Sequence, residues 1–257
     1  PNKQQAVTKR GILKHLALIF DPLGIISSIT LLGKILFRDA CEAKLDWDEQ
    51  LPDDLQKRWQ KWIKLLPEKV EIPRSLAQLK DNVTAIDIHA FGDASINGVC
   101  ATVYLVVHQD GATNQGLLTS KSRLSKKKLT IPRLELISAH MVANVIENVK
   151  TVLKRFNVQN CFGWLDSSVA LYWIKSEGNY KQFVRNRVKK IQEKDYITWK
   201  HVGTDQNPAD IGSRGCHGET IKENWFTGPL WLQEEENWPR DIVPEKTKET
   251  EEEIKPI

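Results

Sequence analysis

The chain has 257 residues, of which 40% are hydrophobic and 27% are charged, and its formal net charge is +4. This is the composition of a soluble globular protein with one large or two small domains, and no apolar run reaches the roughly 18 residues of a membrane-spanning helix. The four cysteines form no C-x-x-C pair, which argues against a zinc site or a disulfide framework and predicts a reducing, intracellular setting.

The charge is distributed unevenly along the chain. Residues 233–257 hold nine acidic and four basic side chains, so this tail carries −5 and the rest of the chain is basic. A basic body suits a polyanionic partner. The polar start without an initiator Met, together with the single Met of the whole chain, indicates a fragment of a longer polypeptide.

The first predicted elements are helices, which lie within residues 10–80. Apolar residues recur at helical spacing over residues 31–40, after a break at residues 21–24, whose sequence is DPLG. A second helix is predicted at residues 53–66, with tryptophans on its apolar face. Two prolines follow and end this helical block.

The pattern changes to β-structure near residue 84. Alternating apolar and polar residues predict a strand that runs into Asp93. Two further strands are predicted at residues 98–107 and 116–122, because both stretches are bounded by turn-forming sequences. The three strands therefore form consecutive hairpins.

The second half of the chain alternates helices with single strands. Pro132 is expected to open a long helix that runs to about Phe156 and carries Glu135 in its first turn. The elements expected after it are a short buried strand at 161–165, helices at 168–176 and 180–194, a strand at 197–202, and a last helix that begins near Asp210.

This order of elements predicts an α/β fold, a mixed five-stranded sheet flanked by helices. We expect three regions: a small helical block at 1–80, the sheet-containing domain at 81–225, and a C-terminal extension at 226–257. Residues 239–257 are rich in charge and poor in apolar side chains, and we expect them to be disordered.

Four acidic residues each fall in a different predicted element. Mg²⁺ prefers oxygen ligands and is usually held by a few carboxylates, water and substrate phosphate. Four acids brought together could hold two such ions, as in many nucleases. Any one of them alone would be read as a solvated surface group, but the four together favour a metal site. The four are Asp93, Glu135, Asp166 and Asp210.

The element order and the acid positions resemble ribonuclease H. Short motifs resemble, more specifically, the Pol polyprotein of BEL/Pao-type retrotransposons, in the region also labelled the Pao retrotransposon peptidase family. The resemblance covers about residues 10–239. The motifs that carry it are FDPLG at 20–24, WD at 47–48 with LP at 51–52, IPR at 72–74, FV-x-NRV at 183–188 and GP-x-WL at 228–232.

This resemblance implies a ribonuclease H that hydrolyses the RNA strand of an RNA/DNA hybrid with two Mg²⁺ ions, which Mn²⁺ can replace. Asp93, Glu135, Asp166 and Asp210 would be the catalytic, metal-binding acids, with Asp93 as the bridging ligand and Asp210 as the most mobile one. The helical block would be a thumb or connection region that grips the duplex. Reverse transcriptase and other Pol segments would be partners, in a cytoplasmic retroelement particle or in the nucleus.

Two groups of residues are candidate contacts to the nucleic acid. Ser95 and Asn97 follow the first acid and could read the 2′-hydroxyl that marks RNA. Seven basic side chains are candidate phosphate contacts, and a solvated basic face explains them equally well. These seven are Lys126, Lys127, Lys128, Arg185, Arg187, Lys189 and Lys190.

Two other functions remain open at the level of sequence. The chain could be a catalytically inactive ribonuclease H-like domain that binds nucleic acid or connects other domains. It could also be an aspartic peptidase, but the residues that follow Asp93 and Asp166 lack the glycine that such catalytic turns carry. A serine nucleophile at Ser167 has no partner base at a motif position, and a helix N-cap is its simpler role.

Overall fold

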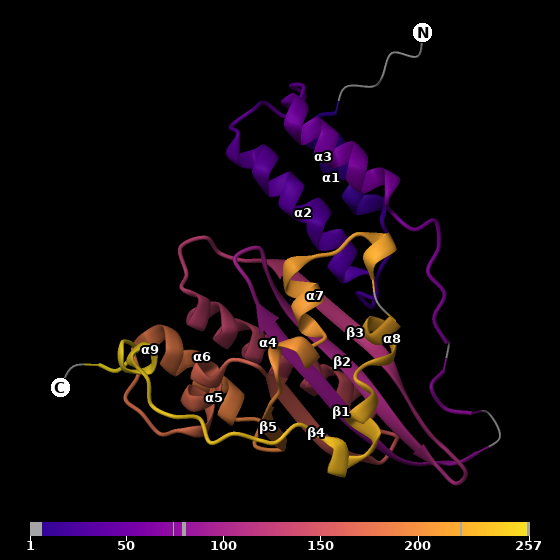
Figure 1. Cartoon of the computed structure of the whole chain (residues 1–257), viewed down its shortest axis with the longest axis vertical. Coiled ribbons are helices and arrows are strands. Elements are labelled where there is room, and N and C mark those ends of the chain that lie inside the picture. The colour runs from indigo at the N-terminus through magenta and orange to yellow at the C-terminus, as the bar shows by residue number, and fades with distance from the viewer. Residues whose placement is uncertain (1–6, 74, 79–80, 222, 256–257) are drawn as a thin grey trace.

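A five-stranded mixed sheet forms the centre of the molecule (Figure 1). The computed structural model describes residues 7–73, 75–78, 81–221 and 223–255; the expected boundary at residue 80 lies outside these ranges. The strands run in the spatial order β3-β2-β1-β4-β5. Their bounds are Val83–Ala94 for β1, Gly98–Gln109 for β2, Thr113–Leu124 for β3, Val158–Leu165 for β4 and Ile197–His201 for β5.

The first three strands pair antiparallel as hairpins, whereas β4 and β5 join the other side of β1 in parallel. The predicted mixed sheet is therefore confirmed, and β1 lies at its middle. Parallel neighbours bring their carboxyl ends to the same edge of a sheet. The last residues of β1 and β4 consequently meet, with Gly92 opposite Leu165.

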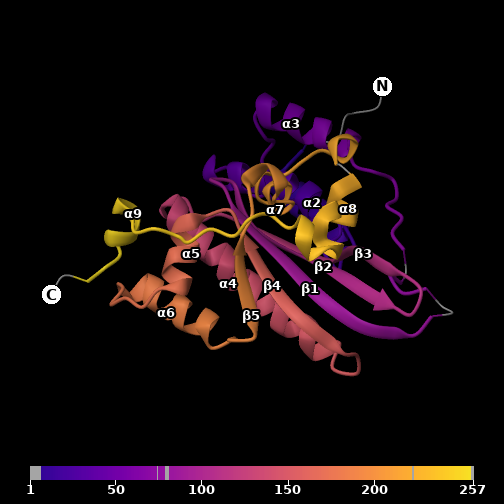
Figure 2. The same ribbon diagram turned by 60° about the horizontal axis from the view of Figure 1, so that its bottom comes forward.

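Helices cover both faces of the sheet. One face packs against α4 (Ile131–Val152), α5 (Ser168–Lys175) and α6 (Gln182–Gln192). The other face packs against α7 (Ala209–Arg214), α8 (Glu223–Thr227) and the irregular chain after α8 (Figure 2). Each layer buries its own apolar cluster, which supplies the main stabilisation of the fold.

The N-terminal block consists of α1 (Lys9–Leu18), α2 (Ser27–Glu42) and α3 (Asp53–Lys64), which share a small core around Trp59 and Trp62. The helical block is shorter than expected, because the described residues between 65 and 82 contain no helix. Within the described parts of the chain, no helix combines the length and the apolar character needed to cross a membrane.

The N-terminal block is fixed to the sheet through the DPLG turn and the start of α2. The carbonyl of Leu23 accepts two hydrogen bonds from β3, one from the backbone N–H of Ser120 at 2.9 Å and one from the hydroxyl of Thr119 at 2.7 Å. The buried hydroxyl of Ser27 lies 2.6 Å from that of Ser120. This polar seam and the contacts of α2 with α7 bind the block to the sheet.

Gly24 explains why this turn can approach so closely. Its φ is +70°, and a Cβ atom at this position would lie 1.8 Å from the carbonyl oxygen of Ser120. Only glycine adopts such a backbone conformation at no steric cost, and only glycine leaves room for the neighbouring strand. The DPLG motif is therefore a docking turn.

The expected disorder of the acidic tail is wrong for residues 239–255. The tail forms the short helix α9 (Lys248–Glu251), and Thr250 is fully buried. Glu253 pairs with Arg133 of α4 at 2.6 Å, and its carbonyl accepts from Lys181 N at 2.7 Å. The composition predicted disorder because the tail has few apolar residues of its own, but it uses polar groups to pack on α4–α6. The expected boundary after residue 225 falls within α8.

Candidate active site

Three acids converge at the carboxyl edge of the two central parallel strands. Asp93 is the penultimate residue of β1, and Asp166 directly follows β4. Glu135 reaches the same point from α4. This helix begins at Ile131, so Glu135 lies just beyond its first turn, and the placement in the first turn was wrong. Because the helix starts one residue before Pro132, Glu135 becomes its fifth residue.

The side chains of Asp93, Glu135 and Asp166 form a compact acid cluster. One carboxylate oxygen from each lies within 4.8 Å of the others. Glu135 Oε1 accepts from the backbone N–H of Ala94 at 3.3 Å, and the Ser213 hydroxyl donates to Asp93. These contacts fix two of the three carboxylates against the end of β1.

Two oxygens of the acid cluster lack a hydrogen-bond partner. Glu135 Oε2 and Asp166 Oδ1 are both buried and unpaired within the described residues. Buried polar atoms are ordinarily satisfied, so orphaned carboxylate oxygens indicate a missing ligand. Carboxylate oxygens are the donors that Mg²⁺ and Mn²⁺ prefer. The residues present therefore fit a divalent metal.

The electrostatics agree with this fit. Burial raises the pKa of Asp93 to about 7; the hydrogen bond from Ser213 opposes the shift, and the charges of Asp166 and Asp210 add to it. Burial, with the neighbouring acids, also raises the pKa of Glu135 well above its usual range, and burial raises that of Asp166. A bound cation would relieve the repulsion that makes the three ionised carboxylates unfavourable.

Asp210, the fourth expected acid, lies near the acid cluster but points its carboxylate at another residue. It is the second residue of α7, and its Oδ1 lies 2.5 Å from Nε of Arg214, one helical turn later. The group of three acids that could share one ion does not include it. Its role as a metal ligand stays a prediction.

Residues 8–167 match the family described as the Pao retrotransposon-like RNaseH-like domain. The chain belongs to this family. The match contains the N-terminal helical block and the three acids of the cluster, and it ends before Asp210. No curated protein sequence matches the chain.

Two solved ribonucleases H and one viral protease–reverse transcriptase are similar to this Pao RNaseH-like chain at low identity. LC11-RNase H1 in complex with RNA/DNA hybrid shares 14% identity (TM-score 0.32; 48% of this chain and 88% of that chain covered). The N-terminal RNase H domain of a Mycobacterium tuberculosis protein shares 13% identity (TM-score 0.33; 52% of this chain and 94% of that chain covered). A foamy viral protease–reverse transcriptase in complex with double-stranded DNA shares 12% identity (TM-score 0.30; 78% of this chain and 36% of that chain covered). The family assignment rests on the family match and on the sheet itself.

Ser95 and Asn97 shape the turn that follows Asp93 in the Pao RNaseH-like chain. The Ser95 hydroxyl donates to the carbonyl of Ser213 at 2.8 Å and accepts from the backbone N–H groups of Asn97 and Gly98. This hydroxyl therefore ties the β1–β2 turn to α7, the helix of Asp210. Both residues are half-buried, and their contact with nucleic acid stays a prediction.

The basic residues predicted as phosphate contacts fall into two groups. Lys126, Lys127 and Lys128 are exposed between β3 and α4, and Lys127 pairs with Glu42 of α2. Arg187 is half-buried on α6, with its guanidinium 3.7 Å from the ring centroid of Phe183. The structure brings Lys126 and Arg187 into one hollow. The others, exposed on α6, are Arg185, Lys189 and Lys190.

Two residues of the site were missed by sequence reasoning. Ser213, which binds Asp93, carries no motif signal of its own. Arg214 has one available signal, because it follows Asp210 by four residues on a predicted helix, and oppositely charged residues at this spacing pair. The N-cap role of Ser167 is confirmed, since its hydroxyl accepts from Ala170 N at 3.2 Å.

Proposed function

We propose that this Pao RNaseH-like chain is a metal-dependent ribonuclease H that hydrolyses the RNA strand of RNA/DNA hybrids. One observation carries the proposal: three acids from three separate elements share one buried point, and two of their oxygens lack a partner. Asp93, Glu135 and Asp166 would hold Mg²⁺ or Mn²⁺. Bound metal supplies activation of the attacking water and neutralisation of charge at the scissile phosphate.

The neighbours of the acid cluster prepare it for this role. Ser213 holds Asp93, and Ala94 N holds one oxygen of Glu135, so two of the three carboxylates are fixed where the acids meet. A preorganised ligand set avoids the cost of ordering side chains during metal binding. The raised pKa of Asp93 means that a proton competes with the cation near neutral pH.

A second candidate is a nucleic-acid-binding domain that no longer cuts, and the pairing of Asp210 with Arg214 favours it. If this ion pair persists in the complex, the fourth acid is unavailable and only one ion can be held. The peptidase alternative draws no support from these contacts, because Ser167 beside Asp166 caps α5 rather than activating a nucleophile.

The test uses three end-labelled duplexes of one sequence, RNA/DNA, RNA/RNA and DNA/DNA, each incubated with Mg²⁺, with Mn²⁺ or with chelator. The proposal expects metal-dependent cleavage confined to the RNA strand of the hybrid. The Asp93→Asn protein is the matched control, because it keeps the size of the side chain and removes one ligand. Metal binding without cleavage would favour the inactive domain, and comparable cutting of DNA/DNA would refute the substrate.

The wider assignments follow from the same proposal. The N-terminal block would add grip on the duplex, and reverse transcriptase and other Pol segments would be the protein partners. Co-purification of the chain with a reverse transcriptase of the same element tests the second assignment.

A further inference from the structure

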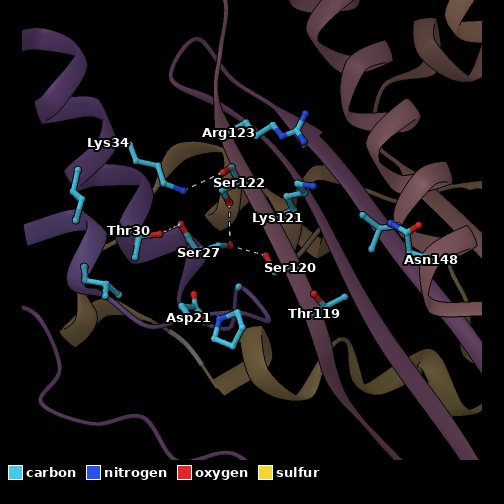
Figure 3. Close-up of a pocket in the computed structure, with 15 residues that line it drawn as sticks. Asp21, Ser27, Thr30, Lys34, Thr119, Ser120, Lys121, Ser122, Arg123 and Asn148 are labelled. Carbon is cyan, nitrogen blue, oxygen red and sulfur yellow. Dashed lines mark hydrogen bonds between the residues drawn. The ribbon is translucent and has the colours of Figure 1, made fainter. Parts of the chain in front are cut away.

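A groove lined by basic side chains runs along β3, between α2 and α4. It consists of two hollows, of about 630 Å³ and 320 Å³, which share Lys121, Arg123, Val145 and Asn148 and are therefore continuous. Figure 3 shows the first hollow, where Lys121 and Arg123 extend from β3 toward the helix that carries Asn148. We call this feature the basic groove.

The basic groove carries a large excess of positive charge. Its only acidic lining residue among those described is Asp21, whose carboxylate accepts two backbone N–H groups at 2.8 and 3.0 Å. None of its five basic residues forms an ion pair in the described part of the chain, so their charges are left for an external anion. The five are Lys34, Lys121, Arg123, Lys126 and Arg187.

Lys34 offers hydrogen-bond donors to an anion in the basic groove. Its ammonium group is half-buried on α2 and makes one long hydrogen bond, 3.4 Å to the carbonyl of Ser122, although it has three hydrogens to donate. Burial lowers the pKa of Lys34, and the charge of Asp21 opposes that shift. An anion in the basic groove would satisfy this ammonium group.

The basic groove also leads to the acid cluster. Ser125, which lines its second hollow, donates its N–H to the carbonyl of Asn97 at 3.0 Å and its hydroxyl to the carbonyl of Ser95 at 2.7 Å. Ser95 lies two residues after Asp93. A ligand that occupies the groove therefore ends beside the turn that follows the first acid.

We propose that the basic groove binds the phosphodiester backbone of the nucleic acid that the acid cluster acts on, and so guides a strand from the N-terminal block to the site. Lys121 and Arg123 are two residues apart on β3, a separation of about 6.8 Å, which is the axial span of about two nucleotides of one strand. This inference rests on the proposed function for the identity of the ligand.

The lining residues also indicate which part of a nucleic acid the basic groove would contact. Among the described residues, those that line the two hollows include no Phe, Tyr or Trp on which a base could stack. Stacking on aromatic residues is the usual means of holding unpaired bases. Recognition here is therefore by charge along the backbone, with little preference for base sequence.

The test measures binding to the complete chain with chelator present, so that no strand is cut. The ligands are a labelled blunt RNA/DNA hybrid and the same hybrid with a single-stranded DNA or RNA extension. The groove variant is K121Q/R123Q, whose two side chains are exposed on β3. The matched control is K154Q/R155Q, which removes the same two charges from exposed positions beyond the end of α4.

We expect K121Q/R123Q to weaken binding roughly 25- to 60-fold near 0.1 M salt and to lower the salt slope by about 1.4 to 1.8, as loss of two phosphate contacts predicts. K154Q/R155Q should change both quantities little. If K121Q/R123Q weakens binding of the extended hybrids only, the groove holds a single strand. If it weakens binding of the blunt hybrid equally, the groove holds a strand of the duplex. Both outcomes support the proposal.

Equal losses of affinity in the two variants, or no loss of affinity in K121Q/R123Q, would overturn the proposal that the basic groove binds nucleic acid. Competition by polyglutamate as strong as that by unlabelled nucleic acid of equal charge would also overturn it, because the groove would then be a general anion surface. Since binding is measured without metal, an inactive acid cluster leaves this result interpretable, and the two proposals can fail separately.

Discussion

Arg214 Nε lies 2.5 Å from Asp210 Oδ1, one turn earlier on the same helix. The hydrogen bond to Asp210 raises the pKa of Arg214, and the charges of Asp93 and Asp166 add to the shift. The guanidinium therefore lies in the field of the acids that would bind metal. A cation that recruits Asp210 must compete with Arg214 for this carboxylate.

The first prediction follows from this competition. Arg214→Gln should tighten Mg²⁺ binding, measured by calorimetric titration, because it releases Asp210 and removes a positive charge from the vicinity. The unfolding free energy should change by less than about 1 kcal/mol, since the Arg214 side chain is largely exposed. Arg10→Gln, which breaks the exposed pair with Asp48, is the control and should leave the affinity unchanged. Weaker Mg²⁺ binding by Arg214→Gln would show that Arg214 orders the ligands instead.

The second prediction concerns Asp93. Asp93→Asn should abolish cleavage and weaken metal binding, because it removes one ligand and its charge. Without metal at pH 8 it should be more stable by roughly 1 to 4 kcal/mol, since the buried carboxylate no longer has to ionise. Denaturant unfolding measures this gain. Near wild-type cleavage by Asp93→Asn would refute its assignment as a metal ligand.

The third prediction is a dependence of stability on pH and metal. The pKa of Asp93 is 3.8 when unperturbed and about 7 in the folded chain. Asp93 therefore binds more protons in the folded state between these values, and its contribution to stability without metal should fall as pH rises from about 4 to 7, whereas buried His89, whose pKa is lowered to about 3, contributes in the opposite direction. Added Mg²⁺ should restore stability at pH 8 by mass action. Thermal melts of the wild-type and Asp93→Asn chains across this range, with and without Mg²⁺, provide the measurement; a metal-free stability difference between the two chains that does not grow with pH would contradict the burial of an ionisable Asp93.

The fourth prediction tests the docking turn. Gly24→Ala should destabilise the chain by about 2 to 4 kcal/mol, because alanine at φ +70° is strained and its Cβ would overlap the carbonyl oxygen of Ser120. Gly111→Ala is the matched control, since the nearest atom to a Cβ there is 3.6 Å away in a side chain. In a denaturant titration, Gly111→Ala should leave the free energy of unfolding nearly unchanged. Equal costs for the two variants would mean that the turn is not held against β3.

The fifth prediction tests the order of the acidic tail. Glu253→Gln should cost about 1 to 3 kcal/mol, because it removes a buried charge from its partner Arg133. Glu252→Gln, at an exposed neighbouring position without an ion pair in the described residues, should be close to neutral. Chemical unfolding of both variants provides the measurement: identical stabilities would show that the pair of Glu253 with Arg133 does not hold the tail on α4.

The strands and the long helices could be predicted because local patterns determine them. The strand into Asp93 alternates apolar and polar residues, and Pro132 lies at the start of α4, where its fixed φ is favourable. The disorder predicted from composition was wrong because Thr250 and Glu253 are buried by residues distant in sequence. Local composition carries no information about such contacts.

The convergence of Asp93, Glu135 and Asp166 was predictable from the ends of the strands and from the family resemblance. The basic groove was not, because Lys34 and Lys121 lie on separate elements that only the docking of α2 brings together. The partner of Asp210 was equally hidden, since a helical spacing shows that two residues can pair and not that they do.

The position of β3 at one edge of the sheet gives the DPLG turn a protective role. An edge strand presents unpaired N–H and C=O groups to which another chain can add, and proteins must cover or interrupt such edges to stay monomeric. Here Leu23 occupies the N–H of Ser120 on that edge. A shortened chain that begins after the helical block would expose β3, and we expect it to self-associate through strand pairing. By covering this edge strand, the N-terminal helices are expected to oppose aggregation.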